Sequence, residues 1–355
     1  MDGYSHSATI RDPAPLRPAA SSSAASSSAG PDAAPASQAL RVMQRTLKAP
    51  IDCVGTGLHS GKRVAIALRP APAGHGIVFR RRDLGIDIPA RFDWVADTRL
   101  CTVLAHPTIA AARVATVEHL MAALAGTGIT NAIVEVDGPE LPILDGSAAS
   151  FVFLIDCAGS VEQDQPAACL EVLRRVRVAG ADGSYAELLP PPRNAAAEIV
   201  PGLSARVAIE FSAPAIGAQA IALHVTPASF RKELAAARTF ALFANIEAMR
   251  QAGLAKGGSL DNAVVVDGAR VLNPSGLRME REFVRHKLLD AVGDLALAGV
   301  VLCATLHAHR AGHALNNRLL RQLLAEPANW RLRDGALPDF LQQPAAPPRA
   351  AGASA

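Results

Sequence analysis

The sequence has 355 residues, of which half are hydrophobic, 19% are charged and only 4% are aromatic. This length allows one large domain or two medium ones, with a core built mainly from Ala, Val, Leu and Ile. The formal net charge of +3 is too small, and the basic residues are too scattered, for a nucleic acid to be the main partner.

The five cysteines form no CxxC pair, which argues against a disulfide framework and against a cysteine-rich structural zinc site. No stretch is as long and apolar as a membrane span requires, and the polar N-terminus lacks the apolar run of a secretory signal. We therefore expect reduced thiols, a cytoplasmic location and no transmembrane segment.

Both ends of the sequence differ in composition from the rest. Residues 1–42 form an extension rich in Ala, Ser and Pro that cannot bury a core, and we predict that it is disordered. Residues 342–355 have a similar composition and are predicted to form a disordered tail. Met43 opens the first patterned segment, so a true start at Met43 is left open.

The first half of the remaining sequence is predicted to contain strands at 64–69, 76–81 and 131–136. A helix is expected from Val117 to about Ala125, with Thr116 as its cap and Gly126 as its stop. A second helix is predicted to begin at Ser147 and to close at Gly159.

The second half repeats this rhythm. Strand-like runs occupy 170–178 and 205–211, and Thr226 with Pro227 has the signature of a helix start, leading to Ala237. The other predicted elements are a short helix at 245–253, a strand at 263–267, a long helix at about 281–298, a strand at 301–308 and a final helix at about 314–325.

Because the strands often come as hairpin-like pairs, we predict an α+β fold of two similar domains, each with a sheet layered against helices. The first domain is expected over residues 43–165 and the second over 169–335. The best boundary is the linker at 163–168.

The predicted helix at 281–298 is apolar over most of its surface, but it carries a polar stripe. The side chains within one arc of this helix are Phe283, His286, Lys287, Asp290, Asp294 and Leu297. A helix this apolar is buried, so the stripe should face a cleft where its charges find partners. His286 and Asp290, spaced i, i+4, can reach one metal ion, although such a pair is often only a hydrogen bond.

The segment ATVEHLMAALAG places Glu118 and His119 side by side in the first turn of a predicted helix. Adjacent side chains point about 100° apart, so one can bind a metal while the other reaches a water on that metal. A hydrolytic zinc site needs this division, with three protein ligands, an open position and a nearby carboxylate base. The alternative is that Glu118 complements the helix dipole and His119 caps a surface.

His313 follows a glycine at the expected start of the last helix. A histidine there could be a general acid that protonates a leaving amine, and Asp294 could keep it charged. We interpret His307 and His309 as alternating side chains on the preceding strand. Thr239, in the run AARTF, offers a hydroxyl that could donate to an oxyanion.

A series of motifs occurs in order over about residues 43–325. They are TGLHSGK (56–62), TRLCT (98–102), TVEHLMAALAG (116–126), PELPILDGSA (139–148), ARTF (237–240), GGSLDNAVVV (257–266), EFVRHKLLDAVGDL (282–295) and GHALNN (312–317). This set resembles the UDP-3-O-acyl-N-acetylglucosamine deacetylase family, which performs the committed step of lipid A synthesis in Gram-negative bacteria. The resemblance implies two α+β domains, each with an insert, and an active site between them.

The resemblance also implies the roles of individual residues. Zn²⁺ would be bound by His119, His286 and Asp290, and Fe²⁺ is an alternative metal. The implied catalytic residues are Glu118 as the base that activates the zinc-bound water, His313 as the acid, Asp294 as the partner of that histidine, Thr239 as a donor to the oxyanion and Lys287 as a substrate contact.

The implied substrate is a UDP-acyl-glucosamine. Leu100 and Phe240 match positions that line the sugar site, and the insert at about 242–271 matches the element that forms an acyl-chain passage. Candidates for the passage walls are Leu242, Ile246, Ser259, Leu260 and Val265. The run ARTFALFAN departs from the usual glycine-containing pattern, and Asn245 replaces a common acidic residue, so the acyl-chain length stays open.

Two alternatives to a zinc hydrolase remain at this point. Two histidines and a carboxylate also describe the facial triad of a non-haem Fe(II) oxygenase. The chain could instead be a non-catalytic binding module for nucleotide-sugars or acyl groups. The full set of ligands, base and acid favours an enzyme, and we expect it to act as a monomer.

Overall fold

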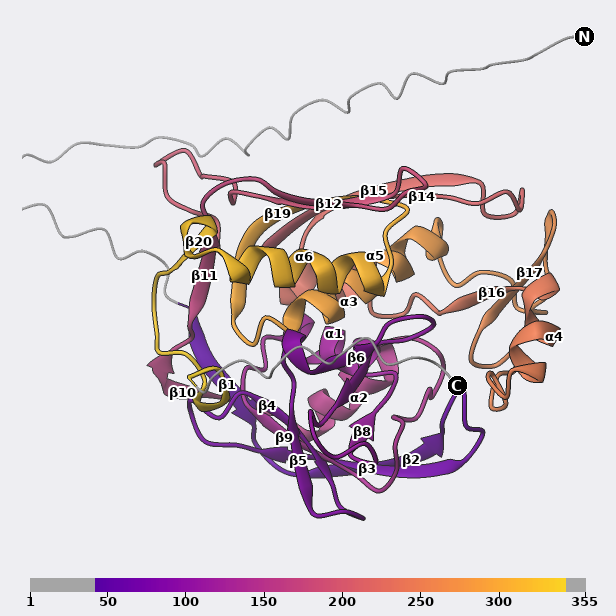
Figure 1. The fold of residues 1–355 in the computed structure, drawn as a ribbon, viewed down its shortest axis with the longest axis horizontal. Coiled ribbons are helices and arrows are strands. Elements are labelled where there is room, and N and C mark those ends of the chain that lie inside the picture. Colours follow the sequence, from indigo (N-terminus) through magenta and orange to yellow (C-terminus); the bar gives the residue numbers. More distant parts are fainter. Residues whose placement is uncertain (1–41, 343–355) are drawn as a thin grey trace, which may run out of the picture. The chain divides into compact units, whose positions relative to one another are not determined.

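The structure is a computed structural model that describes residues 42–342. Runs of strands are interrupted by helices along this range, and the strands gather into two main sheets with helices between them (Figure 1). The predicted α+β class is therefore confirmed. The predicted disorder of the extension and the tail concerns residues that lie almost wholly outside the described ones, and the bounds of the two domains stay a prediction.

The first half builds a sheet in the order β2–β3–β9–β4–β5. Its strands are β2 (Ile51–Thr56), β3 (Arg63–Pro70), β9 (Ala132–Val136), β4 (Ile77–Arg81) and β5 (Ile86–Pro89). Only β4 and β9 run parallel; the other neighbouring strands are antiparallel. The three strands predicted for this half are confirmed as β3, β4 and β9.

The second half builds a larger sheet around one long strand. Its strands are β11 (Cys169–Val172), β12 (Val176–Ala179), β13 (Tyr185–Leu189), β14 (Leu203–Glu210), β15 (Ala218–His224), β19 (Val301–His309) and β20 (Trp330–Leu332). Strand β19 pairs with β11, β13 and β14 along its length. The single strand predicted at 170–178 is wrong, because β11 runs parallel to β19 while β12 joins β13, so the chain turns between them.

Helices from both halves of the chain pack between the two sheets, as Figure 1 shows. They are α1 (Glu118–Thr127), α2 (Ala149–Ala158), α3 (Pro227–Glu233), α5 (Glu282–Ala296) and α6 (His313–Ala325). The core between the layers is mostly aliphatic, with Phe79, Phe151, Phe230 and Phe283 as its largest fully buried side chains. A core of many small aliphatic residues is what the low aromatic content predicted.

The ends of α1 differ from the prediction. Thr116 does not cap the helix: it has a φ of 60°, and the helix begins at Glu118 after Val117 without a side-chain cap. Gly126 does not stop the helix either. It lies inside α1, where the ring of Phe230 packs so closely that a β-carbon would come within 2.3 Å of it. The helix ends at the left-handed Gly128.

The other helix starts follow their local polar groups. Helix α2 begins two residues after Ser147, whose hydroxyl donates to Asp145 at 2.9 Å and accepts from the N–H of Ala149 at 3.1 Å. Thr226 caps α3 as predicted, in a reciprocal capping box with Ser229. Helix α3 ends at Glu233 rather than at Ala237, because the following residues turn towards α5.

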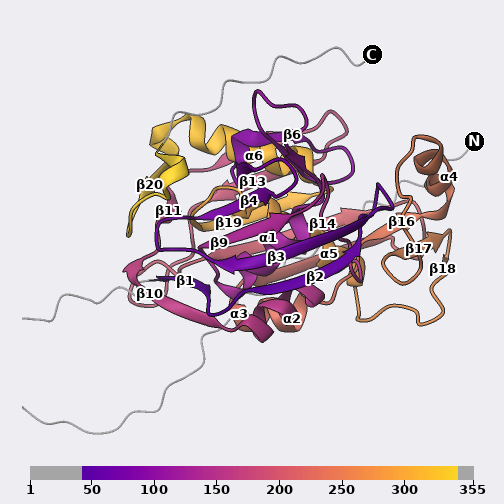
Figure 2. The ribbon, with the colours of Figure 1, turned by 90° about the horizontal axis from the view of Figure 1, so that it is seen from below.

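Each half also carries a small additional sheet. In the first half this is β6 (Val95–Asp97), β7 (Val103–Ala105) and β8 (Arg113–Val114). In the second half, β16 (Phe240–Leu242), α4 (Phe243–Gln251), β17 (Val264–Asp267) and β18 (Arg270–Val271) occupy the segment for which an insert is predicted at about 242–271. Figures 1 and 2 both show this insert beyond the ends of the main sheets.

The remaining elements lie at the periphery. They are β1 (Met43–Leu47), β10 (Ser160–Pro166) and the short 3₁₀ turns η1 (Phe92–Trp94), η2 (Pro327–Asn329) and η3 (Asp339–Leu341). Strands β1 and β10 pair, so much of the predicted linker at 163–168 is an ordered strand. Within residues 42–342, no helix has both the length and the apolar character that crossing a bilayer demands.

Candidate active site

Helices α1 and α5 cross at backbone contact between the two sheets. A β-carbon on Gly293 of α5 would lie 2.0 Å from the carbonyl oxygen of Glu118 on α1. Any larger residue at this crossing would hold the helices apart. The glycine thus lets the first turn of α1 and the polar stripe of α5 share one site, although they are far apart in the sequence.

His119, His286 and Asp290 converge there as a buried cluster whose ligand atoms all lie within 4.8 Å of one another. Oδ1 of Asp290 lies 3.6 Å from Nε2 of His119 and 3.3 Å from Nε2 of His286. Nδ1 of His286 contacts the carbonyl oxygen of Ala237 at 3.0 Å, which orients its Nε2 towards the site.

The cluster contains a buried acceptor that the described residues leave without a hydrogen bond. Oδ1 of Asp290 has no partner among them, although it faces two imidazole nitrogens. A buried carboxylate oxygen needs a proton donor or a cation. Two histidine nitrogens and one carboxylate oxygen are a typical ligand set for Zn²⁺ or Fe²⁺, so these residues fit a metal ion.

The electrostatics keep two of these residues in the form that binds metals. Burial lowers the pKa of His286 to about 4, so its imidazole is neutral at pH 7. Burial alone would raise the pKa of Asp290, but His286 and Lys287 hold it well below its usual range. A neutral imidazole and an ionised carboxylate are both ready to bind a metal without losing a proton.

Lys287 contacts the other oxygen of Asp290, with 2.8 Å between Nζ and Oδ2. Burial alone would lower the pKa of Lys287, but the nearby Asp290 raises it, so the ammonium stays charged. Nζ also lies 5.7 Å from the ring centre of Phe240, which packs edge-on against His286. Lys287 therefore links the metal cluster to the start of the insert.

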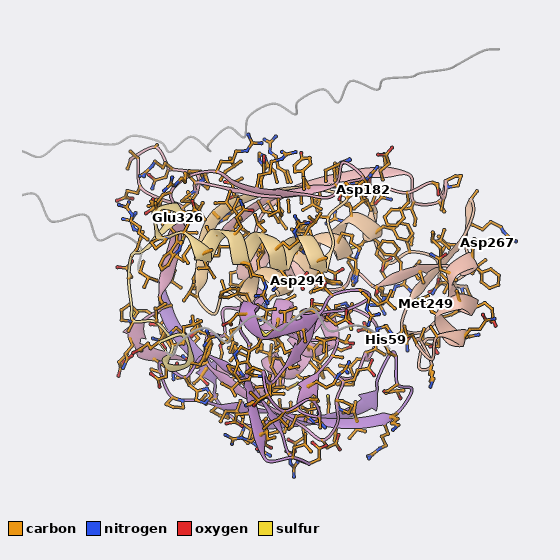
Figure 3. The ribbon with its side chains drawn as sticks, viewed as in Figure 1. His59, Asp182, Met249, Asp267, Asp294 and Glu326 are labelled. Carbon is orange, nitrogen blue, oxygen red and sulfur yellow. The ribbon has the colours of Figure 1, made fainter. Side chains whose placement is uncertain are left out.

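His313 and Glu118 face each other close to the cluster. Nδ1 of His313 lies 2.8 Å from Oδ2 of Asp294, and its Nε2 lies 3.9 Å from Oε1 of Glu118. Burial alone would lower the pKa of His313, but Asp294 and then Glu118 raise it to about 9. The predicted pairing of Asp294 with His313 is thus present in the structure, and Figure 3 shows Asp294 between the layers.

Two further residues hold these groups and were missed in the sequence. Thr102 donates from its hydroxyl to Asp294 at 2.6 Å and from its backbone N–H to Glu118 at 3.0 Å. Asn316 donates to Oδ2 of Asp294 at 2.8 Å. Both lie within motifs of the ordered series, TRLCT and GHALNN, but their partners are distant in the chain and only the fold reveals them.

Thr239 lies beside the cluster in an extended segment. Its N–H donates to the carbonyl of Gly146 at 2.8 Å, and its carbonyl accepts from Val264 at 2.8 Å. Its hydroxyl has no hydrogen-bond partner within residues 42–342. Thr239 follows Ala237, whose carbonyl contacts Nδ1 of His286, by two residues.

The predicted substrate contacts divide between two regions. Leu100, with 46% of its surface exposed, lies two residues before Thr102. The insert holds the predicted passage residues, of which Leu242 and Ile246 are half-buried, Val265 is buried, and Ser259 and Leu260 are exposed. Their role as walls of a passage stays a prediction.

His307 and His309 lie away from this site. Nδ1 of His307 is 3.6 Å from Glu187, and the ring of His309 stacks on Tyr185. Both side chains alternate along β19 with buried residues, so their interpretation as strand side chains is confirmed.

A cluster of two histidines and a carboxylate, beside a buried carboxylate base and a charged histidine, is typical of a metal-dependent amide hydrolase. The family model for UDP-3-O-acyl N-acetylglycosamine deacetylase matches residues 44–325. The chain therefore belongs to this family and is a deacetylase, which confirms the predicted family and enzyme class.

Individual relatives agree with this assignment. The UDP-3-O-acyl-N-acetylglucosamine deacetylase of Idiomarina loihiensis is 48% identical over 293 residues, which are 81% of this chain and 92% of that protein. The enzyme of the same name from Legionella pneumophila (strain Corby) is 46% identical over 293 residues, with the same coverage. That of Acidithiobacillus ferrooxidans is 48% identical over 299 residues, which are 83% of this chain and 94% of that protein.

Proposed function

We propose that this enzyme removes acetate from UDP-3-O-(3-hydroxyacyl)-N-acetylglucosamine, the committed step of lipid A biosynthesis, with Zn²⁺ as its metal and Fe²⁺ as the alternative. The main support is the convergence of two imidazole Nε2 atoms on the unpaired Oδ1 of Asp290. The names of the relatives support the substrate. A monomeric state and a cytoplasmic location stay predictions.

His119, His286 and Asp290 would hold the metal. When bound, the ion supplies Lewis acidity, which makes water a better nucleophile and an amide carbonyl a better electrophile. The ion pair with Lys287 would hold Oδ2 of Asp290 in place. The exposed part of the Lys287 side chain would contact the substrate.

Glu118 would act as the general base. Its Oε2 accepts from the backbone N–H of Thr102 at 3.0 Å, which fixes the carboxylate while Oε1 faces His313. Burial raises the pKa of Glu118, and His313 and His119 partly oppose that change. A carboxylate whose pKa is raised takes a proton from the attacking water more readily than an exposed one.

His313 would act as the general acid. The hydrogen bond from its Nδ1 to Asp294 leaves its Nε2 free to protonate the amine as the bond between nitrogen and the acetyl carbon breaks. Thr102 and Asn316 hold the two oxygens of Asp294 and thereby keep His313 in place. The water proton goes to Glu118, acetate leaves, and the free amine keeps the proton of His313.

Thr239 would stabilise the oxyanion through its hydroxyl, and Phe240 would contact the sugar beside Lys287. The position of Thr239 supports this role, because its N–H and carbonyl are held by Gly146 and Val264 while its hydroxyl has no partner among the described residues. Leu100 and the residues of the insert would contact the sugar and the acyl chain.

The test is acetate release from UDP-3-O-acyl-N-acetylglucosamine by purified protein, with and without a chelator. We expect release that the chelator abolishes and that added Zn²⁺ restores. Parallel assays with Fe²⁺ in the absence of oxygen compare the two metals. A protein loaded with either metal that releases no acetate would contradict the proposal.

A further inference from the structure

Three sequence motifs supply none of the proposed metal ligands, base or acid, and the structure brings them together. The TGLHSGK motif forms the turn between β2 and β3, and the PELPILDGSA motif connects β9 to α2. The GGSLDNAVVV motif lies in the insert and leads into β17. Figure 3 places His59, in the first of these motifs, on the side of the molecule that faces the insert.

Glu140 fills the inside of the turn between β2 and β3. Its side chain is buried, with the residue 5% exposed, and its two oxygens accept from the backbone N–H groups of His59 at 2.7 Å and of Ser60 at 2.9 Å. A β-carbon on Gly57 would lie 2.4 Å from Oε2 of Glu140. A buried carboxylate bound to two backbone donors defines the shape of this turn.

The outer side of the same turn binds the insert through backbone atoms. The N–H of Gly257 donates to the carbonyl of Leu58 at 2.9 Å, and the N–H of Lys256 donates to that of His59 at 3.3 Å. A β-carbon on Gly257 would lie 2.3 Å from the carbonyl oxygen of Gly57. No side chain separates the two segments, so the position of this loop of the insert depends on the shape of the turn.

A second contact joins the PELPILDGSA motif directly to the insert. A β-carbon on Gly146 would lie 1.9 Å from the carbonyl oxygen of Asn262, and the carbonyl of Gly146 accepts from Thr239. The side chain of Asn262 spans the loop, accepting from the N–H of Ser259 and donating to the carbonyl of Gly257. The loop that Glu140 supports is therefore connected through Asn262 and Gly146 to the segment that carries Thr239.

We propose that Glu140 is a positioning residue for acyl-chain selection: by holding the turn at residues 57–61, it fixes the loop at 255–258 and the insert that this loop belongs to. The inference rests on the proposed function, in which the insert receives the acyl chain. Glu140 contacts no reacting group and acts through the turn.

The test is the variant Glu140→Gln, in which an amide NH₂ replaces one of the two accepting oxygens. The measured quantity is the ratio of kcat/KM for the acyl chain that the wild type prefers to kcat/KM for a truncated chain. Losing one charge-assisted hydrogen bond should lower this ratio by roughly tenfold, with kcat on the truncated substrate unchanged. A lower fraction of folded enzyme affects both substrates equally and leaves the ratio unchanged.

Two control variants separate the turn from its surroundings. Glu135→Gln on β9 removes a carboxylate that pairs with Arg69 outside this junction, and it should keep the ratio of the wild type. Thr116→Val removes a weaker contact to Glu140, at 3.5 Å between the hydroxyl and Oε1, without touching the donors of the turn, and it should also keep the ratio. An equal drop in either control would overturn the assignment to the turn.

Gly257→Ala disturbs the same contact from the side of the insert and should lower the ratio as Glu140→Gln does. Amide hydrogen exchange without substrate should be faster at 256–262 in Glu140→Gln than in the wild type. An unchanged ratio in both variants, or unchanged exchange, would refute the inference. A wild type that releases no acetate would refute the proposed function, while hydrogen exchange would still test the role of the turn.

Discussion

The two oxygens of Asp290 have different surroundings, and the difference defines what this residue can do. Oδ2 is bound by Lys287 at 2.8 Å, whereas Oδ1 faces His119 and His286 without a hydrogen bond from the described residues. The lysine thus fixes the rotation of the carboxylate and leaves one oxygen for a cation. The i, i+4 spacing of His286 and Asp290 predicted this pair, but the role of Lys287 in orienting it could not be read from the sequence.

Glu118→Gln should keep the metal and lose most turnover. The amide has almost the same shape and can still be held by Thr102, but it cannot take a proton from water. We expect kcat to fall by about a hundredfold or more, with metal content equal to that of the wild type. Elemental analysis and acetate release measured on the same preparation check this. An unchanged rate would remove Glu118 from the mechanism.

His313→Ala should slow turnover without loss of metal. His313 contacts Asp294 and faces Glu118, and it is outside the cluster formed by His119, His286 and Asp290. The rate should fall by about a hundredfold, the contribution typical of a general acid. His307→Ala, on the outer part of β19, is the matched control and should keep full activity. Loss of the metal from His313→Ala would make His313 a ligand instead.

At the scale of elements, the crossing of α1 and α5 brings the proposed base and metal ligands together. Both helices were predicted from their apolar periodicity and lie within a few residues of their predicted positions. Their close approach was not predicted, because a glycine inside a helical pattern does not show which helix it will face. Gly293 meets Glu118 only in the folded protein.

Gly293→Ala should destabilise the protein and reduce its activity together. The added methyl group would lie 2.0 Å from the Glu118 carbonyl, so the helices must separate. Overpacking of this kind typically costs about 1–3 kcal/mol, measurable by urea unfolding. Gly138→Ala is the control, because its β-carbon would find its nearest neighbour at an ordinary 3.6 Å. Equal stability of the two variants would show that α1 and α5 can move apart freely.

The start of α5 is fixed by a buried ion pair. Glu282 is fully buried and pairs with Arg238 at 2.8 Å, and it also accepts from the N–H groups of Arg238 and Arg278. Burial alone would raise the pKa of Glu282, but these hydrogen bonds lower it below the ordinary value of 4.5. The stability that ionised Glu282 contributes is therefore complete above pH 4.5. It is lost as the pH falls through the lower pKa that Glu282 has in the folded protein.

Glu282→Gln should lose stability at neutral pH and become less sensitive to acid. Breaking a buried pair by removing one charge costs about 3 kcal/mol, because Arg238 is left buried and uncompensated. Unfolding free energies measured from pH 7 down to the acid limit should converge for the variant and the wild type. Glu162→Gln, in an exposed pair with Arg45, should change stability by less than about 1 kcal/mol. Parallel pH curves for wild type and Glu282→Gln would contradict this assignment.

At the scale of the whole molecule, the sequence allowed the α+β class and most helices to be predicted, since caps and periodicity are local. Strands such as β13 and β15 were missed because they are recognisable only by their pairing with β19 and β14. Thr102 and Asn316 were missed for the same reason. Their partner, Asp294, lies 192 residues from Thr102 in the chain.

A metal ion should stabilise the whole fold, since its proposed ligands come from both halves. Binding at a hundredfold excess over Kd would add about 2.7 kcal/mol to the unfolding free energy. A chelator should therefore lower the midpoint of thermal unfolding, and added Zn²⁺ should restore it. In His286→Ala the midpoint should no longer respond to Zn²⁺. A response equal to that of the wild type would place the ion elsewhere.

The site is divided between the halves of the chain in a way that has a consequence for fragments. His119 comes from α1, before β10, whereas His286 and Asp290 come from α5, after it. A protein cut at Ala167–Ala168 would yield one piece with one of the proposed metal ligands and another with two, so neither piece would hold all three. If two separately produced fragments reassociate only when the metal is present, then adding or removing the metal would control whether the complete site forms.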